Sequence, residues 1–304
     1  MSQVIRLIAF PGAHNLSLIA GESQGFFARR GLKVETRITP NSTVLRESLA
    51  RGEFDIAQAV VDNAVAMVEG AGADVVIVMG GDTGMSELFV QPEIASAGEL
   101  RGRTVIVDAP NTAFALQLKK WLLLEGLVAD RDYVVKAVGS TAQRVVAMRD
   151  NRDFAATMLS PPYSIIARRH GLRSLGAAAD RLGPYQAAGT FALRAWAMAN
   201  ADVLERYIAA SVEALRWALA PANRAAATAL LAERLSLDPE VAEGTYAMVA
   251  DPQRGLVVDA RFSLEGFRNS LALRAEIEGQ WGGRVPDPAR YCDLGYYERA
   301  LAAL

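Results

Sequence analysis

The sequence is poor in the residues that build redox and metal centres. Its 304 residues include one cysteine, Cys292, and two histidines, His14 and His170. A single cysteine excludes an intramolecular disulfide and any metal site built from cysteines. Two histidines argue against a histidine metal site as well. We therefore predict no metal and no cofactor.

Charge and hydropathy exclude two further classes of protein. The formal net charge is −2, with no basic face of the kind that binds nucleic acid. No apolar run reaches the roughly 18 residues that a membrane span requires. With 51% hydrophobic residues, the chain has enough apolar side chains for a substantial core. Its length indicates one large domain or two of ordinary size.

The first residues, "MSQVIRLIAF", lead directly into a predicted strand. They lack the basic region, apolar segment and small-residue cleavage site of a secretory signal. We expect either a cytoplasmic protein or the mature form of an exported one.

Strand-like and helix-like segments alternate through about residue 190, which is typical of an α/β protein built from parallel βαβ units. The predicted strands are 4–10, 32–39, 54–61, 74–81, 104–108, 133–138 and 154–160. The predicted helices between them are 15–31, 42–53, 63–72, 112–126, 140–151 and 161–171. From about residue 195 the pattern is helical throughout, and we expect this extension to pack around the first half.

The two halves repeat each other in register. An offset of 98 residues (140 minus 42) matches the pairs Ser42 and Ser140, Thr43 and Thr141, Arg46 and Arg144, Asp55 and Asp153, and Asp62 and Ser160. General similarity between βα units is the alternative explanation. A structural repeat predicts two similar lobes with a cleft between them.

At family level the sequence resembles the type II periplasmic solute-binding proteins of ABC importers. The resemblance rests on "GFFARRGLKVE", "LARGEFDIAQA", "GADVVIVMG", "ELRGRTVIV" and "LLLEGL" in this order, and it covers nearly the whole chain. More narrowly, it is similar to the branch that binds nitrate, alkanesulfonates, taurine and thiamine-pyrimidine precursors.

This resemblance implies a two-lobed type II periplasmic-binding-protein fold with two crossing strands and a helical C-terminal extension. The crossings would lie near 87–92 and 189–194. Lobe one would comprise 1–88 plus 191–304, and lobe two 89–190. The implied protein is a probable monomer in the periplasm that captures a small-molecule ligand by hinge closure and delivers it to an ABC permease with its ATPase.

Ligands of open α/β sheets bind at the carboxyl ends of the strands, where helix N-termini point. The candidate ligand-binding residues at these turns and at the second crossing are His14, Asn15, Ser42, Thr43, Asp62, Asn63, Asp82, Asp108, Asn111, Thr112, Ser140, Thr141, Ser160, Tyr163 and Thr190.

Most of these residues also have a structural interpretation. Ser42, Thr43, Ser140 and Thr141 are first of all helix N-caps. Asn111 and Thr112 fit a cap and a ligand contact equally well. His14 fits a structural imidazole better than a catalytic one, and Tyr163 fits either the core or a ring stacked on a ligand.

Charge gives a hypothesis about the ligand. Asp62, Asp82 and Asp108 lie in the seven turns, which contain no Arg or Lys. Unpaired carboxylates repel an anion, so they favour an aminopyrimidine or another amine-bearing molecule. The alternatives are that the aspartates cap helices, or that helix N-termini hold a sulfonate, taurine or nitrate.

Two other functions remain open. One is an enzyme on the same scaffold, similar to a desulfinase or a thiamine-pyrimidine synthase. Cys292 lies away from every predicted turn, so we favour binding over catalysis. The other is the effector domain of a LysR-type regulator, which requires a helix-turn-helix before the first strand.

Overall fold

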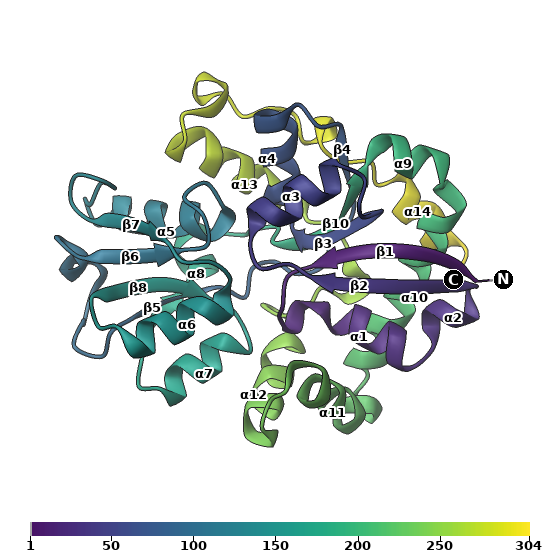
Figure 1. The fold of residues 1–304 in the computed structure, drawn as a ribbon, viewed down its shortest axis with the longest axis horizontal. Helices are drawn as coiled ribbons and strands as arrows, with labels where there is room; N and C mark the ends of the chain where they lie inside the picture. Colours follow the sequence, from purple (N-terminus) through teal and green to yellow (C-terminus); the bar gives the residue numbers. More distant parts are fainter. Residues whose placement is uncertain (1) are drawn as a thin grey trace.

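The computed structural model describes residues 2–304, which form two five-stranded sheets side by side, each with its own helices (Figure 1). Alternate residues of a strand point to opposite faces, and here both faces are apolar. In the first strand, Leu7 and Ile8 belong to separate clusters on the two faces of the sheet. In the second sheet, Val105 and Ile106 are divided in the same way.

The first sheet has the strand order β2-β1-β3-β10-β4. Its strands are β1 Gln3–Ala9, β2 Leu32–Ile38, β3 Ile56–Val60, β4 Val75–Met79 and β10 Ala188–Leu193. Strand β1 pairs in parallel with β2 and β3, whereas β10 runs antiparallel between β3 and β4. A strand from late in the chain therefore completes a sheet that the N-terminal segment begins.

The second sheet has the equivalent order, β7-β6-β8-β5-β9. Its strands are β5 Glu87–Val90, β6 Thr104–Val107, β7 Val134–Ala137, β8 Phe154–Leu159 and β9 Arg173–Ala177. Strand β6 pairs in parallel with β7 and β8, and β5 runs antiparallel to β8 and β9. The matching orders confirm the predicted repeat.

The chain crosses between the lobes twice, once from β4 to β5 and once from the end of β9 to β10. This confirms the two-lobed fold with two crossings. The predicted borders at 88/89 and 190/191 each fall inside a strand, since the whole of β5 belongs to the second sheet and the whole of β10 to the first. The division into 1–88 plus 191–304 and 89–190 stays a prediction.

Helices connect the strands and form the C-terminal extension. Those up to the second crossing are α1 Leu16–Ser23, α2 Phe26–Arg29, α3 Ser42–Ala50, α4 Asp62–Ala71, α5 Ala113–Leu124, α6 Thr141–Asp150, α7 Tyr163–Arg169 and α8 Ala178–Leu182. After β10 follow α9 Arg194–Ala199, α10 Ala201–Leu219, α11 Arg224–Leu235, α12 Pro239–Val249, α13 Leu264–Ile277 and α14 Gly295–Ala302.

The helical extension packs on the first lobe, as predicted. In α10, Tyr207 stacks on Phe27 with ring centroids 5.4 Å apart, and its hydroxyl donates to Gln58 at 3.0 Å. The helix predicted over 15–31 is in fact two helices, because Gly25 adopts a left-handed conformation (φ 73°) between α1 and α2. None of the helices formed by residues 2–304 combines the length and hydropathy of a membrane span.

Gly189 in β10 has no room for a side chain. A Cβ there would lie 2.6 Å from the Met79 carbonyl oxygen and 2.6 Å from Val61 Cγ1. We expect Gly189→Ala to lower the free energy of unfolding by about 1–3 kcal/mol, as measured by urea denaturation. Gly70→Ala in α4 is the matched control, since no atom lies within 4 Å of its Cβ position. Wild-type stability of the Gly189 variant would contradict this packing.

Candidate functional site

A cavity lies at the carboxyl ends of the strands, with walls from both lobes. The empty space in and above it is about 750 Å³, part of which is open solvent. Its lining residues are Phe10, Pro11, His14, Ser42, Val60, Asn63, Asp82, Gly84, Met85, Asp108, Thr112, Ala113, Phe114, Ser140, Thr141, Arg144, Ser160, Pro161, Ala187 and Ala188.

The cavity brings together many of the candidate residues from the sequence. Those that line it are His14, Ser42, Asn63, Asp82, Asp108, Thr112, Ser140, Thr141 and Ser160. Those that do not are Asn15, Thr43, Asp62, Asn111, Tyr163 and Thr190. Binding by any of them stays a prediction.

The residues outside the lining have other surroundings. Thr43 and Asn111 are exposed, whereas Tyr163 packs against a core cluster of the second lobe. Asn15 is buried in the first lobe and donates to the Phe10 carbonyl at 2.6 Å. The Thr190 hydroxyl is buried without a hydrogen-bond partner among residues 2–304.

The helix caps differ between the two halves of the repeat. Ser140 caps α6 in a capping box, with Gln143 Oε1 accepting from the Ser140 backbone N–H at 2.8 Å. In the first half the cap is Asn41, which accepts from the Val44 N–H at 2.9 Å. The predicted capping roles of Ser42 and Thr43 are therefore wrong, and so is that of Thr141, because Ser140 caps α6. Asn41 lies one residue earlier and satisfies the helix N-terminus itself.

Ser42 is free for another contact because it does not cap its helix. Its hydroxyl donates to Asp108 Oδ2 at 2.7 Å, across the cleft between the lobes. The Thr112 hydroxyl, from the N-terminus of α5, lies 2.5 Å from the other carboxylate oxygen of Asp108. Asp108 is therefore held by hydroxyls from both lobes.

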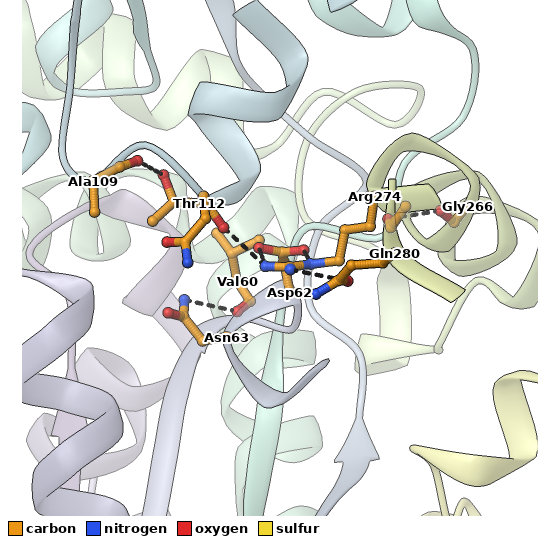
Figure 2. A network of polar contacts seen from close by, with 10 residues as sticks. Val60, Asp62, Asn63, Ala109, Thr112, Gly266, Arg274 and Gln280 are labelled. Carbon is orange, nitrogen blue, oxygen red and sulfur yellow. Dashed lines mark hydrogen bonds and ion pairs between the residues drawn. The ribbon is translucent and has the colours of Figure 1, made fainter. Parts of the chain in front are cut away.

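Asp62 lies at the end of β3, as predicted, but its carboxylate is paired (Figure 2). Arg274 of α13 donates to both oxygens of Asp62, and both side chains are only 2% exposed. Arg274 also donates to the Asn111 carbonyl of the second lobe at 2.9 Å. The premise that Asp62 faces the ligand as an unpaired acid is wrong, because a buried guanidinium compensates its charge.

Asp82 lies on the first crossing and is 4% exposed. Its oxygens accept from the Gly84 N–H at 2.8 Å and from the Ala188 N–H at 3.3 Å. Burial raises the pKa of this carboxyl above its usual range, although these backbone donors oppose the rise. Through these backbone hydrogen bonds, Asp82 joins the two crossing segments.

His14 lies in the turn after β1, where burial lowers the pKa of its imidazole to about 4. The ring is therefore neutral at neutral pH. It offers the cavity a hydrogen-bonding surface but no positive charge.

Arg144 is the cationic residue of the cavity that the inspection of turns missed. It projects from α6, is 1% exposed, and donates to the hydroxyls of Thr157 at 3.1 Å and Thr141 at 3.0 Å. The Arg144 Nε has no hydrogen-bond partner among the described residues. The carboxylate of Asp108 attracts the guanidinium, and this attraction offsets part of the fall in pKa that burial causes. The pKa of the guanidinium falls to about 10 through burial, so the group stays charged at neutral pH.

The repeat contained the signal for Arg144, because the 98-residue offset pairs it with Arg46. Both arginines lie in the helix after the second strand of their half, one turn beyond the predicted loops. An inspection of loops alone passes over them. Phe114 in α5 was missed for the same reason, whereas Phe10 directly follows β1 and Met85 lies in the segment before β5. In the described chain, no group of three or more His, Cys, Asp or Glu side chains is placed to hold a metal ion.

The buried pair of Asp62 and Arg274 generates a stability prediction. We expect Asp62→Asn to lower the free energy of unfolding by about 3–5 kcal/mol, because it leaves the guanidinium buried without its counter-charge. The double variant Asp62→Asn with Arg274→Met should recover part of this loss in urea denaturation.

The control for this pair is Asp74→Asn, which removes the 72%-exposed partner of Arg194. An exposed ion pair is worth about 1 kcal/mol or less. Equal losses at Asp62 and Asp74 would show that the buried pair has no special role.

His14 generates a prediction about acid stability. Because its folded pKa is depressed, the unfolded chain binds the proton more readily between about pH 6.5 and pH 4. This contribution to stability is complete above that window and is lost as the pH falls through it. We expect His14→Gln to flatten the pH dependence of the unfolding free energy there, while His170→Gln, at an exposed position, serves as the control. An unchanged slope in the His14 variant would refute the burial argument.

Comparison with solved structures identifies the fold. A protein from Bordetella bronchiseptica RB50 aligns with a TM-score of 0.84 at 20% identity, over 99% of this chain and 98% of its own. The periplasmic nitrate-binding protein NrtA from Synechocystis PCC 6803 gives 0.81 at 14% identity, over 100% and 89%. The alkanesulfonate-binding protein SsuA from Xanthomonas axonopodis pv. citri, bound to MOPS, gives 0.75 at 20% identity, over 96% and 97%.

No curated protein matches the sequence. The structural likenesses confirm the type II periplasmic-binding-protein fold expected from the sequence. The NMT1-like family model matches residues 4–232, which is more than half of the chain. The chain therefore belongs to the NMT1-like family.

Proposed function

We propose that this protein is the substrate-binding component of an ABC importer and that its ligand is a small organic anion with an apolar body. The observation that carries the ligand class is Arg144, a buried cation in the cavity wall with an unpartnered Nε. Burying a guanidinium is costly unless a counter-charge or hydrogen bonds compensate it. A sulfonate or carboxylate provides both.

The cavity wall holds one cation, Arg144, that pairs directly with no carboxylate of the described residues. Arg46 interacts electrostatically with Asp62 and Asp108, and Arg274 is paired with Asp62. The hydrogen bonds of Arg144 go to hydroxyls, so an anionic head group would supply its direct counter-charge.

The cavity has a polar region and an apolar region, which suit the head group and the body of such a ligand. Ser140, Thr141 and the N-terminus of α6 surround Arg144 with hydroxyls and a positive helix end, which suits an anionic head group. Phe10, Met85 and Phe114 provide apolar surface for the rest of the molecule. An alkyl or aryl sulfonate matches both halves of the site.

An aminopyrimidine or other amine-bearing ligand is the second candidate. Its support was the set of three carboxylates, of which Asp62 is paired with Arg274 and Asp82 has a raised pKa. Asp108 remains as the one cavity carboxylate whose hydrogen bonds come only from hydroxyls. It is therefore the position at which a ligand N–H group would bind.

The surroundings of Cys292, the single cysteine, suit a binding protein better than an enzyme that needs a reactive thiol. Cys292 donates to the Pro288 carbonyl at 3.1 Å and is not a lining residue of the cavity. Burial raises the pKa of its thiol to about 12, which suppresses the reactive thiolate. A desulfinase-like mechanism needs the opposite environment.

Contacts between the lobes support a mechanism of hinge closure. The Ala13 N–H donates to the Pro161 carbonyl at 3.3 Å, and Ser42 donates to Asp108. Between α5 and the C-terminal extension, Lys119 and Lys120 pair with Glu278 and Glu276 at 2.9 Å and 2.5 Å. A ligand that contacts both walls favours this closed arrangement by its differential affinity. The closed monomer would then deliver the ligand in the periplasm to a membrane permease with its ATPase.

Replacing Arg144 tests the ligand class. We expect Arg144→Gln to weaken binding of butanesulfonate by at least ~30-fold in isothermal titration calorimetry, because a buried charge pair is lost. Arg152→Gln, on the exposed surface of the same lobe, should bind as the wild type does. A thermal melt of each variant confirms that it is folded.

Titration of the wild type with an aminopyrimidine separates the two candidates. Tight binding of that compound, with no binding of sulfonates or carboxylates, would overturn the organic-anion proposal and restore the amine-bearing ligand.

A further inference from the structure

A second cavity lies in the first lobe, next to the ligand cavity. It is narrow, with free space of about 10 Å³, which is close to what one water molecule needs. Its walls include Met79, Leu215, Leu256 and Ala260, which are all apolar. An alkyl chain could therefore extend in this direction only through space that the side chain between the two cavities vacates.

One side chain separates the two spaces. His14 lines both the ligand cavity and the second cavity, and the only other residue common to both is Ala188. The imidazole is the bulky part of this shared wall, since Ala188 contributes a single methyl group. Removal of the His14 ring would connect the two cavities.

The surroundings of His14 hold the ring in place. Gly12 leaves room for it: a Cβ at position 12 would lie 2.8 Å from His14 Nδ1. The same turn is fixed by Asn15, which donates to the Phe10 carbonyl, and by the bond from Ala13 to Pro161 of the second lobe. The wall is therefore tied to both lobes in the closed form.

The second cavity suits an apolar chain better than a polar group. Its polar side chains besides His14 are Ser17 and Gln58. Gln58 is already occupied, because it donates to Asn15 at 3.3 Å and accepts from Tyr207 at 3.0 Å. A methylene chain entering this space makes apolar contacts and disrupts no hydrogen bond of Gln58. The neutral state of the His14 ring at neutral pH keeps this wall uncharged.

We propose that His14 is a specificity-determining residue, whose ring closes the second cavity to the ligand and so limits the length of the apolar part of the bound anion. This inference rests on the proposed function, since it assumes an organic anion with its head group at Arg144. It assigns His14 a role in selecting ligand length rather than in acid–base chemistry.

A homologous series of linear alkanesulfonates, from ethanesulfonate to octanesulfonate, tests this role by calorimetry. The wild type should show a chain length beyond which affinity falls. In His14→Ala the optimum should move to chains about two methylenes longer, and those chains should bind about tenfold more tightly than to the wild type. His14→Gln keeps a side chain of similar length and should retain the wild-type optimum.

Two further variants complete the design. His170→Ala makes the same substitution at an exposed position and should leave the whole series unchanged. His14→Val is the replacement if His14→Ala does not give a cooperative thermal melt, and it should lengthen the optimum less.

The possible outcomes separate the two proposals. If the wild type binds the series and the optimal chain length does not change in His14→Ala, the role of His14 in limiting ligand length is wrong and the organic-anion function stands. If the wild type binds no sulfonate and no carboxylate of any length, the proposed function fails and this inference fails with it.

Discussion

The arrangement of the site depends on the buried ion pair between Asp62 and Arg274. It joins the end of β3 to α13 of the C-terminal extension, and the same guanidinium contacts the second lobe at the Asn111 carbonyl. Two charges with 2% exposure remain stable only because their hydrogen bonds are nearly complete. This pair fixes the extension, the first lobe and the start of α5 in one arrangement, and it removes one negative charge from the neighbourhood of the ligand.

The fold was largely predictable because its signals are local or periodic. Apolar strands and alternating helices are set within a few tens of residues, and the repeat recurs at one fixed offset. Ser140 capped its helix as its sequence context indicated. The departures were also local: Gly25 divides one predicted helix, and Asn41 takes the capping role expected of Ser42. In both departures neighbouring residues compete for one structural role, and amino-acid composition alone does not decide which residue takes it.

The electrostatics of the site were not predictable in the same way. Asp62 and Arg274 are 212 residues apart, and no periodicity connects them. Arg144 lies within a helix rather than in a loop, so its place in the cavity wall depends on how α6 packs. The sequence therefore indicated several of the turns that line the cavity, but the sign of the charge there required the tertiary structure.

The strand order of the first sheet has a consequence for biosynthesis. Because β10 lies between β3 and β4, the first lobe cannot complete its sheet until residues after the entire second lobe have been synthesised. The second sheet, in contrast, uses only strands between residues 87 and 177. On the ribosome, the inserted lobe has all its strands before the lobe that surrounds it, and the N-terminal strands must wait with unpaired edges.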